Sequence, residues 1–167
     1  MPLTVTLTGL DGALRTLTTL QSRLDNLVPP LTATREIALA SVRRNFQAGG
    51  RPQRWAPLKY RRGRPLLDTG RLQGSITGQV TGNSVVIGTN LAYAALHNFG
   101  GRIQIPEMRA QRGRAFRFTT QTGEVIFRTR IRAHTVLIPQ REFLLLQEQD
   151  IADIIRVFEK YVLSTTA

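Results

Sequence analysis

The chain of 167 residues contains no cysteine, so it can form neither a disulfide framework nor a thiolate metal site. Its only histidines are His97 and His134, which excludes a histidine-rich metal site. No apolar run approaches the roughly 20 residues that a membrane-spanning helix needs. The first residues also lack the basic segment and apolar core of a signal peptide. We therefore expect an intracellular chain that folds without a metal, a cofactor or a membrane.

Acidic side chains are scarce in the middle of the chain, and lysine is scarce throughout. The formal net charge is +12, but residues 37–141 alone carry +15, while residues 1–36 are neutral and residues 142–167 carry −3. All of the 23 basic residues except Lys59 and Lys160 are arginine, whose planar fork suits carboxylate, phosphate and carbonyl partners. This uneven charge predicts head-to-tail packing of identical subunits, basic middle against acidic end.

Catalytic motifs are also missing. The sequence has no Walker A loop, no Gly-x-Ser-x-Gly elbow and no His-Glu-x-x-His helix. Its 11 acidic residues are too few and too scattered for paired-carboxylate or two-metal chemistry. We therefore expect no enzymatic activity, no catalytic residue, no cofactor and no metal ligand.

Hydrophobic periodicity predicts several elements in the first half of the chain. A strand is expected at 3–8, followed by a helix capped by Asp11 and broken at Pro29-Pro30. The apolar face of this helix comprises Leu14, Leu17, Leu20, Leu24 and Leu27. A second helix is expected over about 32–47, ended by Gly49-Gly50, and then an extended basic loop over 49–67.

The second half reads as short helices and hairpins. Asp68 or Thr69 is expected to cap a short helix that runs through Leu72. The further expected elements are a hairpin of 75–80 and 84–88, a helix at 91–99, a hairpin of 114–120 and 124–130, a strand or bend at 135–146, and a helix at 148–163. The order predicts one α+β domain over 1–167, with a mostly antiparallel sheet packed by N-terminal and C-terminal helices. An extended arginine-rich hairpin arm is expected at 102–133.

Four spaced patches read together as one signature. They are WAPLK at 55–59, LLDTGRL at 66–72, YAALHNFG at 93–100 and IPQREFL at 138–144. In this order they resemble the phage virion morphogenesis (tail completion) family, with matches over about residues 40–160. Here the third and fourth patches are separated by a long segment, 102–137, in which the expected arm lies.

The resemblance implies a structural protein of a tailed phage that completes the tail or joins it to the head. Such proteins act as multi-copy ring components, so we expect a homo-oligomeric ring, sixfold like the tail, that binds connector or tail-tube proteins. The expected location is the virion neck or the head-proximal tail end, reached from the host cytoplasm during assembly. A non-virion assembly factor is an alternative.

Two sets of residues are therefore singled out. The structural signature comprises Asp68, Gly70, Arg71, Leu72, Tyr93, His97, Phe99, Gly100, Pro139, Arg141, Phe143 and Leu144. The interface candidates are Arg51, Arg54, Trp55, Lys59, Arg61, Arg62, Arg64, Arg112, Arg114, Arg117, Arg128, Arg130 and Arg132.

Several of these residues have two interpretations. Trp55 either closes the core beneath its loop or anchors an interface. Asp68 caps a helix or pairs with Arg71, and Arg141 could pair with Asp68 or with the acidic last helix. We expect His97 to be a packed, hydrogen-bonded side chain rather than a ligand.

Sequence-independent DNA binding is the main competing function. The arginine-rich strands could follow phosphates, and phage DNA passes through a neck. However, aromatic residues make up only 7% of the chain and no recognised nucleic-acid-binding motif is visible.

Overall fold

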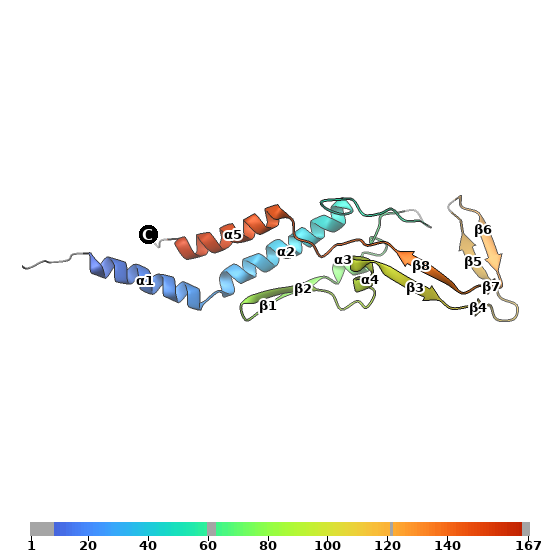
Figure 1. The fold of residues 1–167 in the computed structure, drawn as a ribbon, viewed down its shortest axis with the longest axis horizontal. Coiled ribbons are helices and arrows are strands. Elements are labelled where there is room, and N and C mark those ends of the chain that lie inside the picture. The colour runs from blue at the N-terminus through green and yellow to red at the C-terminus, as the bar shows by residue number, and fades with distance from the viewer. Residues whose placement is uncertain (1–8, 60–62, 121, 165–167) are drawn as a thin grey trace, which may run out of the picture.

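The structure is a computed structural model that describes residues 9–59, 63–120 and 122–164. The molecule is elongated, with helix α1 (Leu10–Asp25) at one end and two short strand pairs at the other (Figure 1). The strand expected at 3–8 lies outside the described residues. The α+β class is confirmed, although the strands within these ranges form four two-stranded antiparallel sheets and not one larger sheet.

Helix α1 extends from one end of the molecule and buries none of its residues. It begins after Gly9, which has a φ of 96°, so the prediction that Asp11 is the cap was wrong. Asp11 lies in the first turn, where its charge complements the helix dipole. Near the other end of α1, the Arg23 guanidinium donates a hydrogen bond to the Val162 carbonyl at 2.9 Å.

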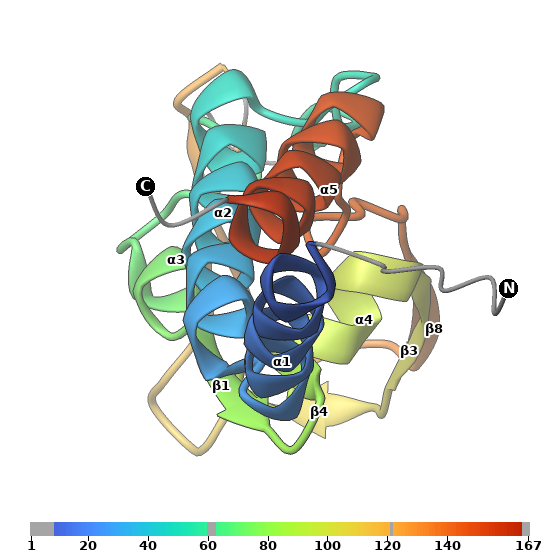
Figure 2. The same cartoon turned by 90° about the vertical axis from the view of Figure 1, so that its left-hand side faces the viewer.

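Helix α2 (Val28–Ala48) is the central element of the fold. It begins at Val28, four residues before the predicted start. Pro29 and Pro30 lie in its first turn, where the backbone N–H groups that proline lacks would have no intrahelical partner. Gly49 ends it in the left-handed conformation, as predicted. Figures 1 and 2 show helix α5 (Glu148–Leu163) lying along α2.

A hairpin packs on another side of α2. Strand β1 (Thr77–Thr81) pairs antiparallel with β2 (Ser84–Gly88), and Thr81 lies opposite Ser84 across a two-residue turn. The helix lies so close that a Cβ atom on Gly78 would come within 2.9 Å of Arg35 Cγ. Two short helices, α3 (Arg71–Gly74) and α4 (Ala94–Phe99), flank this hairpin in the sequence.

The segment between α4 and α5 folds as successive antiparallel strand pairs. Strand β3 (Gly101–Ile105) pairs with β8 (His134–Ile138), β4 (Met108–Arg109) with β7 (Arg130–Ile131), and β5 (Phe116–Thr119) with β6 (Val125–Arg128). The strands expected at 114–120 and 124–130 are thus shortened. Arg130 belongs to β7, because Thr129 interrupts the strand and its carbonyl accepts a hydrogen bond from the Ala110 amide.

The apolar core lies where α2, α3, α4 and the segment before α5 meet. Its fully buried cluster comprises Val42, Phe46, Leu72, Ala94 and Phe143. The Phe46 ring lies 5.3 Å from that of Phe143 and 5.5 Å from that of Trp55, centroid to centroid. These contacts bring the first and last signature patches together.

A buried polar network joins α2 to α5. The Asp150 carboxylate is 1% exposed; it accepts hydrogen bonds from the Ser41 hydroxyl and, at 2.6 Å, from the Arg44 guanidinium. It also accepts the Gln147 backbone N–H at 2.9 Å as part of a capping box. Burial alone would raise the pKa of Asp150, but the Ser41 and Gln147 hydrogen bonds and the charges of Arg44 and Arg51 lower it below its ordinary value of 3.8.

Two asparagine amides hold the chain that precedes α5. Asn45 Nδ2 donates hydrogen bonds to the Phe143 and Leu145 carbonyls at 3.0 and 2.8 Å. From α4, Asn98 Oδ1 accepts the Phe143 and Leu144 N–H groups, both at 3.1 Å. Because both amides are at least 96% buried, the backbone of 143–145 is fixed between two helices.

Replacing the buried carboxylate tests this network. We expect Asp150→Ala to lower the free energy of unfolding by about 2–4 kcal/mol, because it leaves the Ser41 hydroxyl and the Arg44 guanidinium without their acceptor and removes the negative charge beside Arg51. The matched change Asp153→Ala removes a half-exposed partner of Arg156 and should cost less than about 1 kcal/mol. Urea unfolding at neutral pH measures both. Since the pKa of Asp150 is lowered, its contribution is present above pH 3.8 and is lost as the pH falls further. Equal costs for the two variants would contradict the prediction.

Candidate functional site

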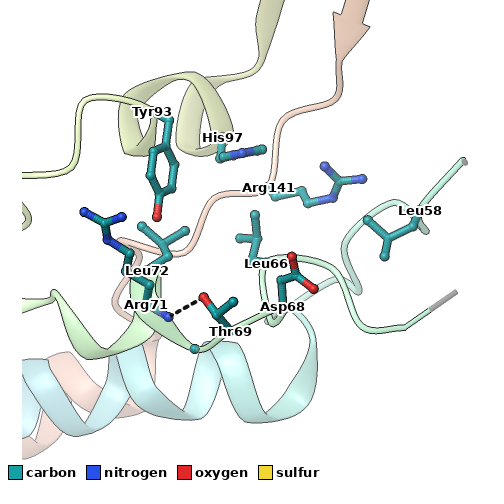
Figure 3. Close-up of a pocket in the computed structure, with 10 residues that line it drawn as sticks. Leu58, Leu66, Asp68, Thr69, Arg71, Leu72, Tyr93, His97 and Arg141 are labelled. Atoms are coloured by element: carbon teal, nitrogen blue, oxygen red, sulfur yellow. Dashed lines mark hydrogen bonds between the residues drawn. The ribbon is translucent and has the colours of Figure 1, made fainter. Parts of the chain in front are cut away.

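Residues from all four signature patches line one surface pocket of about 250 Å³ (Figure 3). They come from the loop before α3, from α3, from α4 and from the chain after β8. The lining residues are Leu58, Leu66, Asp68, Thr69, Gly70, Arg71, Leu72, Tyr93, His97 and Arg141. The fold thus gathers side chains that are up to 83 positions apart in the sequence, from 58 to 141.

One side of the pocket is built by the start of α3. Gly70, with a φ of 75°, is the residue before the helix, so neither Asp68 nor Thr69 occupies the cap position predicted for them. Thr69 Oγ1 nevertheless accepts the Arg71 N–H at 3.4 Å. Leu72 is 4% exposed and anchors α3 in the core, which leaves Arg71 exposed on the same side of the pocket as Tyr93 (Figure 3).

The other side is held by Arg141. Its Nε and Nη2 atoms donate hydrogen bonds to the Ala56 and Pro57 carbonyls at 3.0 and 3.2 Å, and its backbone N–H donates to the His97 carbonyl at 2.9 Å. Arg141 is only 6% exposed. Arg141, which belongs to the patch at 138–144, therefore links the patch at 55–59 to the patch at 93–100.

His97 lies between these two sides. Its ring meets that of Tyr93 edge-on at 6.0 Å, and its buried Nδ1 atom has no hydrogen-bond partner within the described part of the chain. The side chain is packed as expected, but at Nδ1 it lacks the expected hydrogen bond. Burial, and then the charge of Arg141, lower the pKa of His97 below its ordinary value of 6.5, so the imidazole is neutral at pH 7.

The remaining signature residues support the pocket from behind or beside it. Phe143 is fully buried in the core, and Leu144 packs against it. Gly100 has a φ of 72°, and a Cβ atom there would lie 2.8 Å from the Gln140 amide nitrogen, so both conformation and space require glycine. Pro139 is half-buried, whereas Phe99 is 71% exposed and belongs to the outer surface.

The interface candidates of the 51–64 loop divide into two groups. Arg51 points inward, where its Nε donates to Asn45 Oδ1 at 2.8 Å and its Nη2 to the Ser41 carbonyl at 2.9 Å. Arg64 Nη2 donates to the Phe46 and Gln47 carbonyls at the end of α2. Arg54 and Lys59 are exposed, and Arg61 and Arg62 lie outside the described residues.

Trp55 packs against the core, which is the first of the two interpretations given above. Its indole ring packs edge-on against Phe46, and its Nε1 donates to the Glu142 carbonyl at 3.2 Å. It therefore closes the core beneath the loop.

The arginines beyond β3 and β8 are exposed. They are Arg112, Arg114, Arg117, Arg128, Arg130 and Arg132. Phe127 is 62% exposed and Phe118 40%, and the strand register puts them on opposite faces of the β5–β6 pair. Arg117 shares a face with Phe127, so arginine and apolar side chains are mixed on this face of the pair.

The residues that sequence reasoning missed are polar side chains in buried positions. Ser41, Asn45, Asn98 and Asp150 are each at least 96% buried. Asn45 and Ser41 interrupt the apolar face of α2, and this interruption was the available signal. Their partners are backbone groups and side chains about 100 residues away, which no local pattern reveals.

The pocket has the chemistry of a polar contact site. Thr69 Oγ1 is engaged by the Arg71 amide, and no hydrogen bond between the described residues links it to His97 as a base. Among residues 9–59, 63–120 and 122–164, no cluster of three or more His, Asp or Glu side chains could hold a metal ion. No helix of the same ranges is long and apolar enough to span a membrane.

Sequence comparison agrees with the gathered signature. The model of the phage virion morphogenesis family matches residues 8–163, and the chain therefore belongs to this family. It is also 38% identical over 135 residues to the Mu-like prophage FluMu G protein 2 of Haemophilus influenzae, a match that covers 81% of this chain and 75% of that protein. No solved structure matches the chain. The chain is thus a phage protein of virion morphogenesis.

The titration of His97 tests the geometry of the pocket. Because its folded pKa lies below 6.5, the unfolded chain takes up the proton first, and the stability of the protein should fall as the pH drops from 7.5 to about 5. His97→Gln should reduce this fall, whereas His134→Gln should retain it. Thermal melts at several pH values measure the slope for each protein. An NMR titration midpoint for His97 at or above 6.5 would contradict the assignment.

Proposed function

We propose that the chain is a structural protein of the tailed-phage particle that forms a closed ring at the neck, where it completes the tail or joins it to the head. Family membership supports a role in virion morphogenesis. The ring would be sixfold to match the tail, and closed cyclic symmetry uses one head-to-tail interface repeatedly. The protein would act by docking, without catalysis, and would enter the virion from the host cytoplasm.

The main support for this proposal is the exposed apolar and arginine side chains at the end of the molecule away from α1. The β5–β6 pair exposes Phe127, Phe118 and Val125 together with Arg117 and Arg128. A two-stranded hairpin with exposed apolar residues on both faces gains little stability on its own in water. Arginine and aromatic side chains are also the types enriched at protein interfaces. This surface therefore suits a connector, a tail-tube protein or a neighbouring subunit.

A second function is favoured by the charge of the same surface. Glu107 accepts the guanidinium groups of Arg109 and Arg130 at 3.0 and 2.6 Å, while Arg112, Arg114 and Arg132 have no ion pair with a described residue. Unpaired arginines could contact phage DNA during its passage through the neck. Such contact would be independent of sequence and would weaken steeply with salt.

Changing the β5–β6 surface tests the docking role. We expect Arg117→Glu/Phe127→Ser to fold normally, since both side chains are exposed, but to reduce incorporation into particles by roughly tenfold or more. The matched control Arg43→Glu changes the same charge at an exposed position of α2 and should leave incorporation unchanged. Quantitative mass spectrometry of purified virions from complemented phage gives the copy number per particle. Normal incorporation of the double variant would contradict a docking role for this surface.

The same particles separate the alternatives. A chain required for infectivity but absent from virions would support an assembly factor instead of a virion component. Mobility-shift binding that persists at moderate salt and is lost in Arg112→Glu/Arg114→Glu would support the DNA-binding function.

A further inference from the structure

The leucine side chains of α1 form an apolar surface that the rest of the described chain leaves uncovered. Leu10, Leu14, Leu17 and Leu24, which we call the leucine ridge, are between 55% and 61% exposed. They recur at helical spacing on one face, whereas Thr19 and Ser22 lie on the other side of the helix. A helix of 16 residues has marginal stability in water on its own, so α1 would gain stability if the ridge were covered.

The same chain has an apolar groove of about 250 Å³ elsewhere on its surface. Its lining comes from α2, from β2 and from the chain just before α5. The residues of this groove are Thr34, Ala38, Val42, Val85, Ile87, Leu144, Leu145 and Leu146. Threonine is the only polar residue type among them, so the groove offers almost no hydrogen-bonding groups and suits an apolar occupant.

The ridge and the groove match in length. The groove follows α2 from Thr34 to Val42, about 12 Å at 1.5 Å per residue, and Leu10 to Leu17 spans about 10 Å. Leucines at positions i, i+4 and i+7 form the kind of ridge that fits a groove between neighbouring elements. The chain thus carries two complementary apolar surfaces.

Within one chain the two surfaces do not meet. Only Asn26 and Leu27 separate α1 from α2, and α1 points away from the body of the molecule (Figure 1). Two hydrogen bonds to the end of α5 hold it there: Arg23 Nη1 donates to the Val162 carbonyl at 2.9 Å, and the Tyr161 hydroxyl donates to the Asn26 carbonyl at 2.6 Å. In this position the ridge of a chain does not occupy the groove of the same chain.

Charge favours a second copy meeting this one through α1. Each chain carries a formal charge of +12, so two copies repel each other when their basic bodies approach. Residues 1–36 have no net charge, because Asp11, Asp25 and Glu36 balance Arg15, Arg23 and Arg35. Helix α1 can thus enter the groove of a neighbour without adding to the repulsion.

We propose that α1 of one copy seats its leucine ridge in the apolar groove of a second copy. Each chain then offers one ridge and one groove, so the contact is head-to-tail and repeats around a ring. The inference rests on the proposed function only in that copies of the chain must associate. It assigns the contact between subunits to α1 and leaves the β5–β6 surface for another component.

Cysteine cross-linking tests the contact directly, since the natural chain has no cysteine. Leu17→Cys and Leu146→Cys proteins are mixed and oxidised mildly; position 146 lies in the groove and is 37% exposed. We expect roughly tenfold more disulfide dimer from this pair than from Ser22→Cys with Leu146→Cys, because Ser22 lies on the far side of α1. Equal yields would overturn the proposal. So would an intrachain disulfide at high dilution in a chain carrying both Leu17→Cys and Leu146→Cys, because it would show α1 in its own groove.

Native mass spectrometry separates this inference from the proposed function. Leu14→Glu/Leu17→Glu should fold like the natural chain, because α1 buries none of its residues, but should lose the oligomer. The control Thr19→Glu/Ser22→Glu introduces the same charges on the side of α1 away from the ridge and should retain it. If the natural chain and both variants all form the ring, the α1 contact is overturned and the ring stands. If the natural chain is monomeric at every concentration and absent from particles, both proposals fail.

Discussion

The burial of the Asp150 carboxylate is the constraint on which the rest of the structure depends. A buried carboxylate is strongly unfavourable unless charged and polar partners surround it. Ser41 and Arg44 supply them from α2, and Gln147 supplies one from the start of α5. These partners can meet Asp150 in one arrangement of the two helices, so the network sets the relative position of α2 and α5. The chain immediately before α5 is thereby brought to the core.

The pocket is a consequence of that placement. Once residues 143–145 lie between Asn45 and Asn98, Phe143 enters the core and Arg141 reaches the carbonyls of Ala56 and Pro57. Five fully buried apolar residues form a small cluster for a chain of this length, and the buried hydrogen bonds compensate by fixing the irregular segments around it. Part of the arginine excess therefore serves the fold, because Arg51, Arg64 and Arg141 donate hydrogen bonds to the backbone carbonyls of Ser41, Phe46 and Ala56. The arginines beyond β3 and β8, by contrast, are exposed.

Features that depend on local periodicity could be predicted from the sequence, and features that depend on distant partners could not. The extents of α5 and β2 were predicted because their stripe, alternation and flanking residues are local signals. The role of Pro29-Pro30 was misjudged, since proline can end one helix and open the next, and only the packing of Leu31 in the core shows which applies. The signature residues were identified through a family resemblance, but their meeting in one pocket follows from contacts such as Arg141 with Ala56, 85 positions apart. Likewise, arginine composition alone does not distinguish Arg51, which points inward, from Arg54, which is exposed.

The strand pairs between α4 and α5 have a consequence for how this region can vary in length. Strand β3 begins at Gly101 and β8 ends at Ile138, and these two residues are paired in the register. The two points at which this segment joins the core therefore stay adjacent, whatever the length of the chain between them. Pairs of facing residues can be inserted or deleted at the far end of the two strands without moving Gly100 or Pro139. The β3–β8 pair already holds the two ends of the segment together. The entropic cost of a change in length therefore arises only in closing the new turn. The segment beyond Ile105 and before His134 is thus a natural graft point, where an epitope or a shorter turn can replace the native tip while the pocket and the core keep their geometry.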